Sequence, residues 1–178
     1  ASLIAVVVAL TAISYPFLPR QLTIVSSLTI GIPAFALALA PNDRRYRSGF
    51  LRRVLALAVP AGLVAGIMTL AARQWLALEG AEQAQVTTAA TLVLVVSGLS
   101  LLTLTARPLL GWRLGLVLLM AGAAVLGVLI PGVREFFVLA WPDPGTWLTI
   151  VVAGGAAVVG IEIVHLVRRR LVGAEPRD

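Results

Sequence analysis

The sequence predicts an all-α membrane protein, a polytopic bundle of six transmembrane helices that form a single domain. Hydrophobic residue types make up 60% of the 178 residues, above the roughly 45–50% of soluble domains. Only 12% are charged, and these residues lie between long uncharged stretches. The apolar runs are continuous rather than alternating, which indicates helices instead of barrel strands. A water-soluble enzyme is therefore excluded.

Six apolar runs define the expected helices in order. They cover about residues 1–15, 22–40, 54–72, 86–106, 114–130 and 146–167. Five are long enough to cross a hydrocarbon core of about 30 Å at a rise of about 1.5 Å per residue. The first has only 15 residues before Pro16 and begins at Ala1 rather than Met. We therefore expect it to continue a helix that begins upstream.

Arginine placement predicts the orientation of the bundle. All 14 basic residues are Arg, and eleven lie in the loop 41–53, the turn 107–113 and the tail 168–178. The alternate connections hold only Arg20, Arg73 and Arg134. Because positive charge accumulates on the cytoplasmic side, we expect a plasma-membrane protein with both chain ends in the cytoplasm. These charges end apolar runs and form no basic stripe on a soluble surface, so no nucleic-acid partner is expected.

Small and hydroxyl residues predict contacts between helices. Glycines four residues apart let two helix backbones approach closely. Such pairs are Gly62 with Gly66 and Gly111 with Gly115. Hydroxyl side chains in the run 86–106 are expected to hydrogen-bond to neighbouring helices; they are Ser97, Ser100, Thr103 and Thr105.

The run 22–40 carries the residues that point to chemistry. Pro33 removes a backbone donor and its ring clashes with the carbonyl of Thr29, while Gly31 loosens the same turn, so we expect the helix to break or kink. Unwound backbone at membrane depth is tolerated inside protein or along a wet cavity, and its carbonyls are potential cation ligands. Ser26, Ser27 and Thr29 add hydroxyl oxygens. The alternative is a proline kink that the same hydroxyls repair.

Three short motifs frame this run: Pro-Phe-Leu-Pro at 16–19, Leu-Thr-Ile-Gly-Ile-Pro-Ala-Phe at 28–35 and Pro-Asn at 41–42. With Gly-Phe-Leu-Arg-Arg at 49–53, they resemble the fifth-to-seventh membrane-helix region of P-type cation-transporting ATPases, most closely the bacterial branch linked to calcium. The sixth membrane helix of calcium pumps in this family reads Asn-x-x-Thr-Asp-Gly-x-Pro, with the Asn and Asp as calcium ligands. This chain keeps Thr29, Gly31 and Pro33 but has Ser26 for the Asn and Ile30 for the Asp.

The resemblance implies the C-terminal membrane half of an ATP-driven cation pump, its fifth to tenth membrane helices, with calcium as the expected ion. Its metal ligands would be backbone or hydroxyl oxygens of Ser26, Thr29, Ile30 and Gly31. Thr11 and Ser14 on the preceding helix would extend the ion path. Replacing the Asp by Ile30 removes a carboxylate that a hard divalent cation prefers, which leaves the identity of the ion open.

The resemblance also implies partners and cofactors outside this chain. The partners would be the lipid bilayer, the transported cation, and the upstream membrane helices and cytoplasmic ATPase domains of the same protein. ATP and Mg would bind in those domains, because this chain has neither the family's Asp-Lys-Thr-Gly phosphorylation motif nor a phosphate-binding loop. We therefore expect no ATP hydrolysis by this chain alone.

Glu162 is the only acid inside an expected span, which makes it a candidate for the ion path. It lies one turn before His165 and close to Arg168–Arg170, so an interfacial charge cluster is the other interpretation. Two further classes of function stay open on the sequence. One is a self-contained six-helix scaffold or assembly subunit with no ion site. The other is a small permease that uses Glu162 or the kink.

Overall fold

The structure, a computed structural model, describes residues 17–39, 50–107 and 111–173. The regular elements of these residues are all helical: α2 (Pro19–Ser26), the π-helical turn η1 (Ser27–Gly31), α3 (Ile32–Ala38), α4 (Phe50–Leu78), α5 (Gln83–Thr105), α6 (Trp112–Leu129), α7 (Pro131–Phe136) and α8 (Pro144–Gly173). Five candidate spans result, at 19–38, 54–78, 83–105, 112–129 and 144–170. The helical membrane bundle is thus confirmed. The expected span 1–15, with Thr11 and Ser14, lies outside the described residues.

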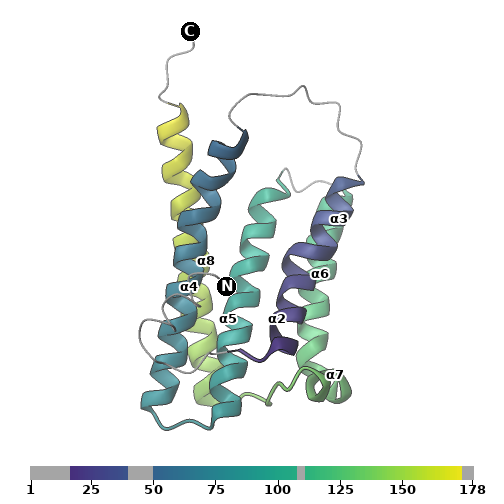
Figure 1. Cartoon of the computed structure of the whole chain (residues 1–178), viewed down its shortest axis with the longest axis vertical. Helices are drawn as coiled ribbons and strands as arrows, with labels where there is room; N and C mark the ends of the chain where they lie inside the picture. The colour runs from purple at the N-terminus through teal and green to yellow at the C-terminus, as the bar shows by residue number, and fades with distance from the viewer. Residues whose placement is uncertain (1–16, 40–49, 108–110, 174–178) are drawn as a thin grey trace.

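Helix α5 lies at the centre of the bundle. On one side it packs against α4 and α8, which also pack against each other, and on the other side it contacts α2, η1 and α6 (Figure 1). Of the residues in its apolar window 56% are buried, against 22–28% in the other four spans. Helix α5 is therefore the element that both groups of helices share.

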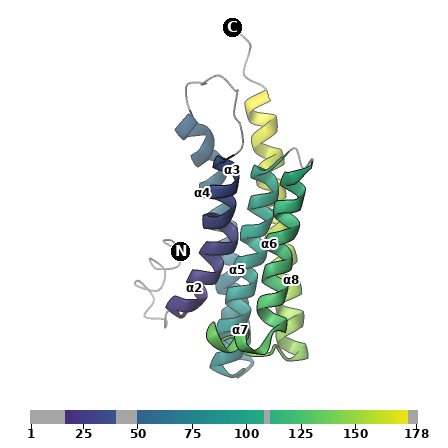
Figure 2. The same ribbon diagram turned by 90° about the vertical axis from the view of Figure 1, so that its right-hand side faces the viewer.

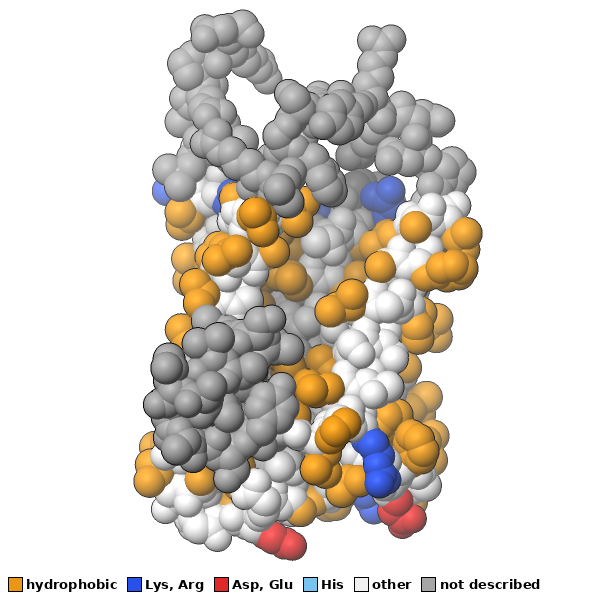
Figure 3. Space-filling view, viewed as in Figure 1, with side chains coloured by type: hydrophobic (Ala, Val, Ile, Leu, Met, Phe, Trp, Pro, Cys, Tyr) orange, Lys and Arg blue, Asp and Glu red, His pale blue; other side chains and the backbone are white. Residues whose placement is uncertain are grey.

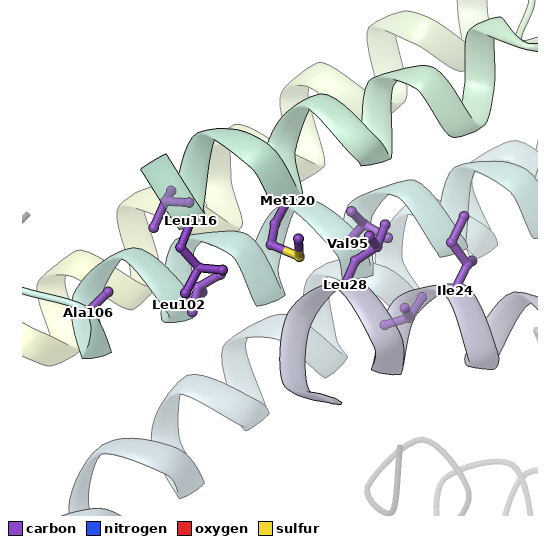
Figure 4. Close-up of a cluster of buried hydrophobic side chains, with 9 residues drawn as sticks. Ile24, Leu28, Val95, Leu102, Ala106, Leu116 and Met120 are labelled. Carbon is purple, nitrogen blue, oxygen red and sulfur yellow. The ribbon is translucent and has the colours of Figure 1, made fainter. Parts of the chain in front are cut away.

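A cluster of apolar side chains joins η1 and α2 to α5 and α6. Ile24 and Leu28 meet Val95 and Leu102 of α5 and Met120 of α6, and all five are buried (Figure 4). Lipid is as apolar as these side chains, so this cluster stabilises the bundle through close packing rather than through removal of apolar surface from water. It holds the candidate turn against the central helix.

The outer surface of the bundle is apolar, as contact with lipid requires. Phe35, Leu119 and Val151 are among the many large apolar side chains that stay exposed, at 69%, 63% and 66%. Figure 3 shows apolar side chains along the flanks, with charged side chains gathered towards the two ends of the described bundle. This distribution is typical of a protein whose middle layer contacts hydrocarbon chains.

Proline and one carboxylate define where helices begin. Pro19, Pro131 and Pro144 each occupy the first turn of their helices, where the missing N–H is not needed. Asp143 precedes α8, and its Oδ1 accepts a 2.6 Å hydrogen bond from the N–H of Thr146. That backbone hydrogen bond is the main cause that holds the pKa of Asp143 below its usual range.

The helix boundaries differ from the predicted ones at two places. Helix α4 runs from Phe50 to Leu78 and continues through Pro60, so it is longer than the expected run 54–72. Neighbouring helices allow a membrane helix to tolerate an interior proline. The short helix α7 was not predicted, and it lies across the end of the bundle at which α2 begins (Figure 2). We call this end the α7 end.

Two predictions about helix contacts are wrong for three of the four residues that each one named. No described atom lies within 4 Å of a Cβ added at Gly62, Gly111 or Gly115, so these glycines do not mark close helix approaches in the described structure. The hydroxyls of Ser97, Thr103 and Thr105 donate to backbone carbonyls of their own helix rather than to a neighbour. Serine and threonine satisfy themselves locally in this way when the carbonyl three or four residues back is within reach.

Candidate functional site

The run 22–40 stays helical through Pro33 instead of breaking. Residues Ser27–Gly31 form one π-helical turn between α2 and α3, and the N–H of Ile32 donates to the carbonyl of Ser27, five residues back. The prediction of unwound backbone is therefore wrong, and the irregularity takes the form of a π turn. A π turn shifts the hydrogen-bond register by one residue, and Pro33 supplies no N–H, so at least one carbonyl of this turn is left without a helical donor.

The candidate ligands of this turn do not all face the same way. Ser26 and Ile30, four residues apart, are both exposed, as is Gly31, and Ile30 is 65% exposed. Thr29 is half-buried and lies against α5. The structure thus gathers three of the four predicted positions on an open face and directs the fourth into the bundle.

Both hydroxyls keep their acceptor capacity. The Oγ of Ser26 donates to the carbonyl of Thr23 at 3.1 Å, and the Oγ1 of Thr29 donates to the carbonyl of Val25 at 2.7 Å. A hydroxyl that donates one hydrogen bond retains two lone pairs. Each oxygen could therefore still coordinate a cation.

Gly98 of α5 is the point at which η1 and α5 approach most tightly. A Cβ added at Gly98 would lie 2.5 Å from Cγ2, 2.7 Å from Cβ and 3.1 Å from Oγ1 of Thr29. Real side-chain contacts are essentially never this short, so only glycine fits there. No small-residue pattern in the sequence marks Gly98, because it has no glycine or alanine partner four residues away, at Leu94 or Leu102.

An apolar groove of about 310 Å³ opens beside the turn, between η1 and α6. Its lining residues are Ile24, Ser27, Leu28, Ala123, Leu126, Gly127, Ile130, Val133 and Phe137. Ser27 contributes the single polar side chain in this set, so the groove lacks the several oxygen ligands that a cation needs. Among the described residues no three His, Cys, Asp or Glu side chains come together as a metal cluster either.

Gln21 anchors the start of α2 at the α7 end. Its side chain is completely buried, its Oε1 accepts from the N–H of Leu18 at 3.1 Å, and its Nε2 donates to the carbonyl of Val138 at 3.0 Å. Val138 has a positive φ of 54°, which is strained for a β-branched residue. The glutamine therefore holds a strained segment of the α6–α8 connection against α2.

The same connection is also attached to α5. The Oγ1 of Thr88 accepts from the N–H of Ala140 at 2.8 Å, and the Nε2 of Gln85 donates to the carbonyl of Trp141 at 2.9 Å. These hydrogen bonds fix the α7 end of α2 and α5 to one shared segment. The sequence contains no pattern that signals these long-range contacts, which join residues 52 and 56 positions apart.

Glu162 lies at the opposite end of the bundle in an ion pair. Nη2 of Arg107, which follows α5, is 3.1 Å from Oε1 and 3.4 Å from Oε2 of Glu162 in α8. The two side chains are 44% and 38% exposed. This geometry agrees with the interpretation of Glu162 as a member of an interfacial charge cluster, with Arg107, 55 residues away in the chain, as a partner that sequence spacing does not reveal.

Arg73 occupies an unexpected place. We predicted it as a charge in a connection, yet it lies within α4 and is only 8% exposed, and its Nε has no hydrogen-bond partner in the described structure. Its helix position is five residues before Leu78, where α4 ends. An arginine side chain at that depth can bury its aliphatic stem and extend its guanidinium towards the interface.

Comparison with known proteins identifies the family. The chain is 42% identical over 182 aligned residues to the calcium-transporting ATPase CtpE of Mycobacterium bovis, and it is as similar to CtpE of Mycobacterium tuberculosis; both alignments cover 98% of the chain. CtpE of Mycolicibacterium smegmatis is also 42% identical, over 92% of the chain. The chain spans about a fifth of the length of these relatives, 21–22%.

A more distant relative carries a broader name. The probable cation-transporting ATPase exp7 of Streptococcus pneumoniae is 24% identical over 68% of the chain and 16% of its own length. No family model and no solved structure matches the chain. The helical membrane bundle and the 42% identity along almost the whole chain lead to one conclusion: this chain belongs to the P-type ATPase family and corresponds to a membrane-embedded part of such a protein.

Proposed function

We propose that this chain is the C-terminal membrane half of an ATP-driven calcium transporter and that its helix α2–η1–α3 forms part of the ion path. The observation that carries this proposal is the π turn before Pro33 inside a membrane span. An interrupted hydrogen-bond ladder at membrane depth leaves backbone oxygens free, and such oxygens serve as cation ligands in transporters.

The ligands available from this turn are neutral oxygens. The carbonyls of Ser27–Gly31 and the lone pairs of Ser26 and Thr29 can replace water around a cation, but Ile30 offers only its carbonyl. Ca²⁺ takes six to eight oxygens and favours carboxylates among them. The charged ligands would therefore come from the upstream membrane helices. We propose that the open face with Ser26 and Ile30 is turned towards those helices.

Calcium is the proposed ion because three relatives at 42% identity are named calcium-transporting ATPases. ATP and Mg would bind in the cytoplasmic domains of the full protein, and this chain would couple to those domains through its neighbouring helices. Thr11 and Ser14 remain candidates for the ion path. For Glu162 we favour the interfacial role, since its ion pair with Arg107 already neutralises the carboxylate.

The test uses the full-length pump in membrane vesicles and measures ATPase activity against free calcium. Ser26→Ala and Thr29→Ala each remove one hydroxyl ligand, so each should raise the half-saturating calcium concentration roughly ten-fold, the equivalent of about 1.4 kcal/mol. Thr105→Ala is the matched control, because this exposed hydroxyl is bonded to its own helix in the same way.

Three results would count against the proposal. An unchanged half-saturating concentration in both variants would remove Ser26 and Thr29 from the ion path. Wild-type activity that does not respond to calcium would reject calcium as the ion. A response of Thr105→Ala as large as theirs would show that any lost hydroxyl has this effect.

A further inference from the structure

We infer that Gly98 is a positioning residue for the proposed ion-binding turn, because the missing side chain at this site sets how closely η1 packs on α5. The inference rests on the proposed function. Thr29 stands at the centre of Ser27–Gly31, so the depth at which it lies against α5 fixes where the neighbouring oxygens stand. Gly98 itself contributes no ligand.

The contact at Gly98 cannot be relieved by moving a side chain alone. One of the close atoms is Cβ of Thr29, 2.7 Å from the added Cβ. The backbone fixes the position of a Cβ, so this atom moves only when the backbone of Thr29 moves. Threonine is stiff at χ1, and its Oγ1 is held by the carbonyl of Val25 at 2.7 Å. A side chain at 98 would therefore push the backbone of η1 away from α5.

Another glycine near α2 shows the contrast. A Cβ added at Gly127 of α6 would lie 3.2 Å from Cδ1 of Ile24. That atom is the far end of a flexible side chain, which can shift by a few tenths of an ångström. A side chain added at Gly98 would therefore displace the backbone of the candidate turn, whereas one added at Gly127 would displace only the end of the Ile24 side chain.

Ion affinity should respond to such a displacement before the fold does. Val25 and Leu28 pack in the same buried cluster as Val95 and Leu102 of α5, so the helix keeps its register on α5. Calcium–oxygen distances span only about 2.3–2.6 Å, and a metal site tolerates deviations of about 0.2 Å. A turn displaced by half an ångström would lose cation affinity while its helix stays packed.

The experiment compares Gly98→Ala with wild type in the full-length pump, by ATPase activity against free calcium. The half-saturating calcium concentration should rise on the order of ten-fold, with a smaller change in kcat, because displaced oxygens no longer meet calcium at its usual distances. Gly155→Ala is the control, since no described atom lies within 4 Å of its added Cβ. It should leave the calcium dependence unchanged.

A second substitution separates positioning from general damage to the fold. Thr29→Ser removes Cγ2, the atom nearest to the added Cβ at 2.5 Å, and keeps the hydroxyl. Gly98→Ala combined with Thr29→Ser should therefore recover part of the affinity lost in Gly98→Ala, read against Thr29→Ser alone. Recovery supports the inference even when Gly98→Ala by itself folds poorly.

Either of two outcomes overturns the inference: an unchanged calcium dependence in Gly98→Ala, or a double variant no better than Gly98→Ala. A wild-type pump that ignores calcium is a different result. It overturns the proposed function, and with it the role assigned to Gly98.

Discussion

Individual side chains set the helix ends, and Asp143 is the best-defined case. Its carboxylate accepts the N–H of Thr146, and its carbonyl accepts the N–H of Trp147 at 2.8 Å. The first N–H groups of a helix have no partner inside the helix, and a negative charge next to them is favourable. The lowered pKa of Asp143 reports this stabilisation of the charged form.

Asp143→Asn should lower the thermal midpoint of the purified pump by a small amount at about pH 7, and Asp143→Ala by more, because Asn retains an acceptor. A depressed folded-state pKa adds stability above the unfolded value of 3.8, and this stability is lost as pH falls through the folded-state pKa. The advantage of wild type over Asp143→Asn should therefore vanish in strongly acidic solution. A difference that persists there would mean that the charge of Asp143 is not its source.

At the scale of elements, helix α2 is held firmly at one end and irregular at its middle. Gln21 fixes its start to the carbonyl of Val138, whereas the π turn begins six residues later, at Ser27. A fixed end next to an irregular turn directs any bending of the helix to that turn. This division matches a role in which the turn adjusts around an ion while the α7 end stays in place.

Gln21→Leu should lower the free energy of unfolding of the detergent-solubilised pump by about 1–3 kcal/mol, because the carbonyl of Val138 and the N–H of Leu18 both lose their partner. Gln85→Leu is the matched control. It removes a similar hydrogen bond to the same connection, at 2.9 Å to the carbonyl of Trp141, from a half-buried side chain. Equal losses in the two variants would argue against a special role for the buried anchor.

At the scale of the whole molecule, the helix ends that flank the arginine-rich segments of the sequence lie at one end of the bundle, and α7 lies at the other. The last turn of α8, the start of α4 and the described residues on either side of 108–110 share one end (Figure 1). The arginine bias predicts that this end faces the cytoplasm. The α4–α5 turn with Glu79, exposed at the α7 end, would then face outward.

Cysteine labelling tests this orientation, and the chain contains no native cysteine. In a full-length pump freed of other cysteines, Glu79→Cys should react with a membrane-impermeant maleimide in intact cells. Trp112→Cys should react only after the cells are permeabilised. The reverse pattern would invert the bundle and contradict the assignment of both chain ends to the cytoplasm.

Much of the fold follows from the sequence because lipid imposes a strong local rule. Backbone polar groups that face lipid must be paired within their own helix, so apolar runs such as 86–106 and 114–130 identify α5 and α6 within a few residues. The position of the candidate turn could also be predicted from local sequence. Pro33 and Gly31 mark it, and both act on the backbone of their own helix.

The tertiary structure decided what depends on contacts between distant residues. Pro33 alone could not determine whether the helix would unwind or form a π turn; the packing of Ile24, Leu28 and Met120 accompanies a turn that stays helical. The closeness of Thr29 to Gly98 and the reach of Gln21 to Val138 join residues far apart in the chain. Local periodicity carries no information about such pairs, because which helix faces which is set by how all the helices pack together.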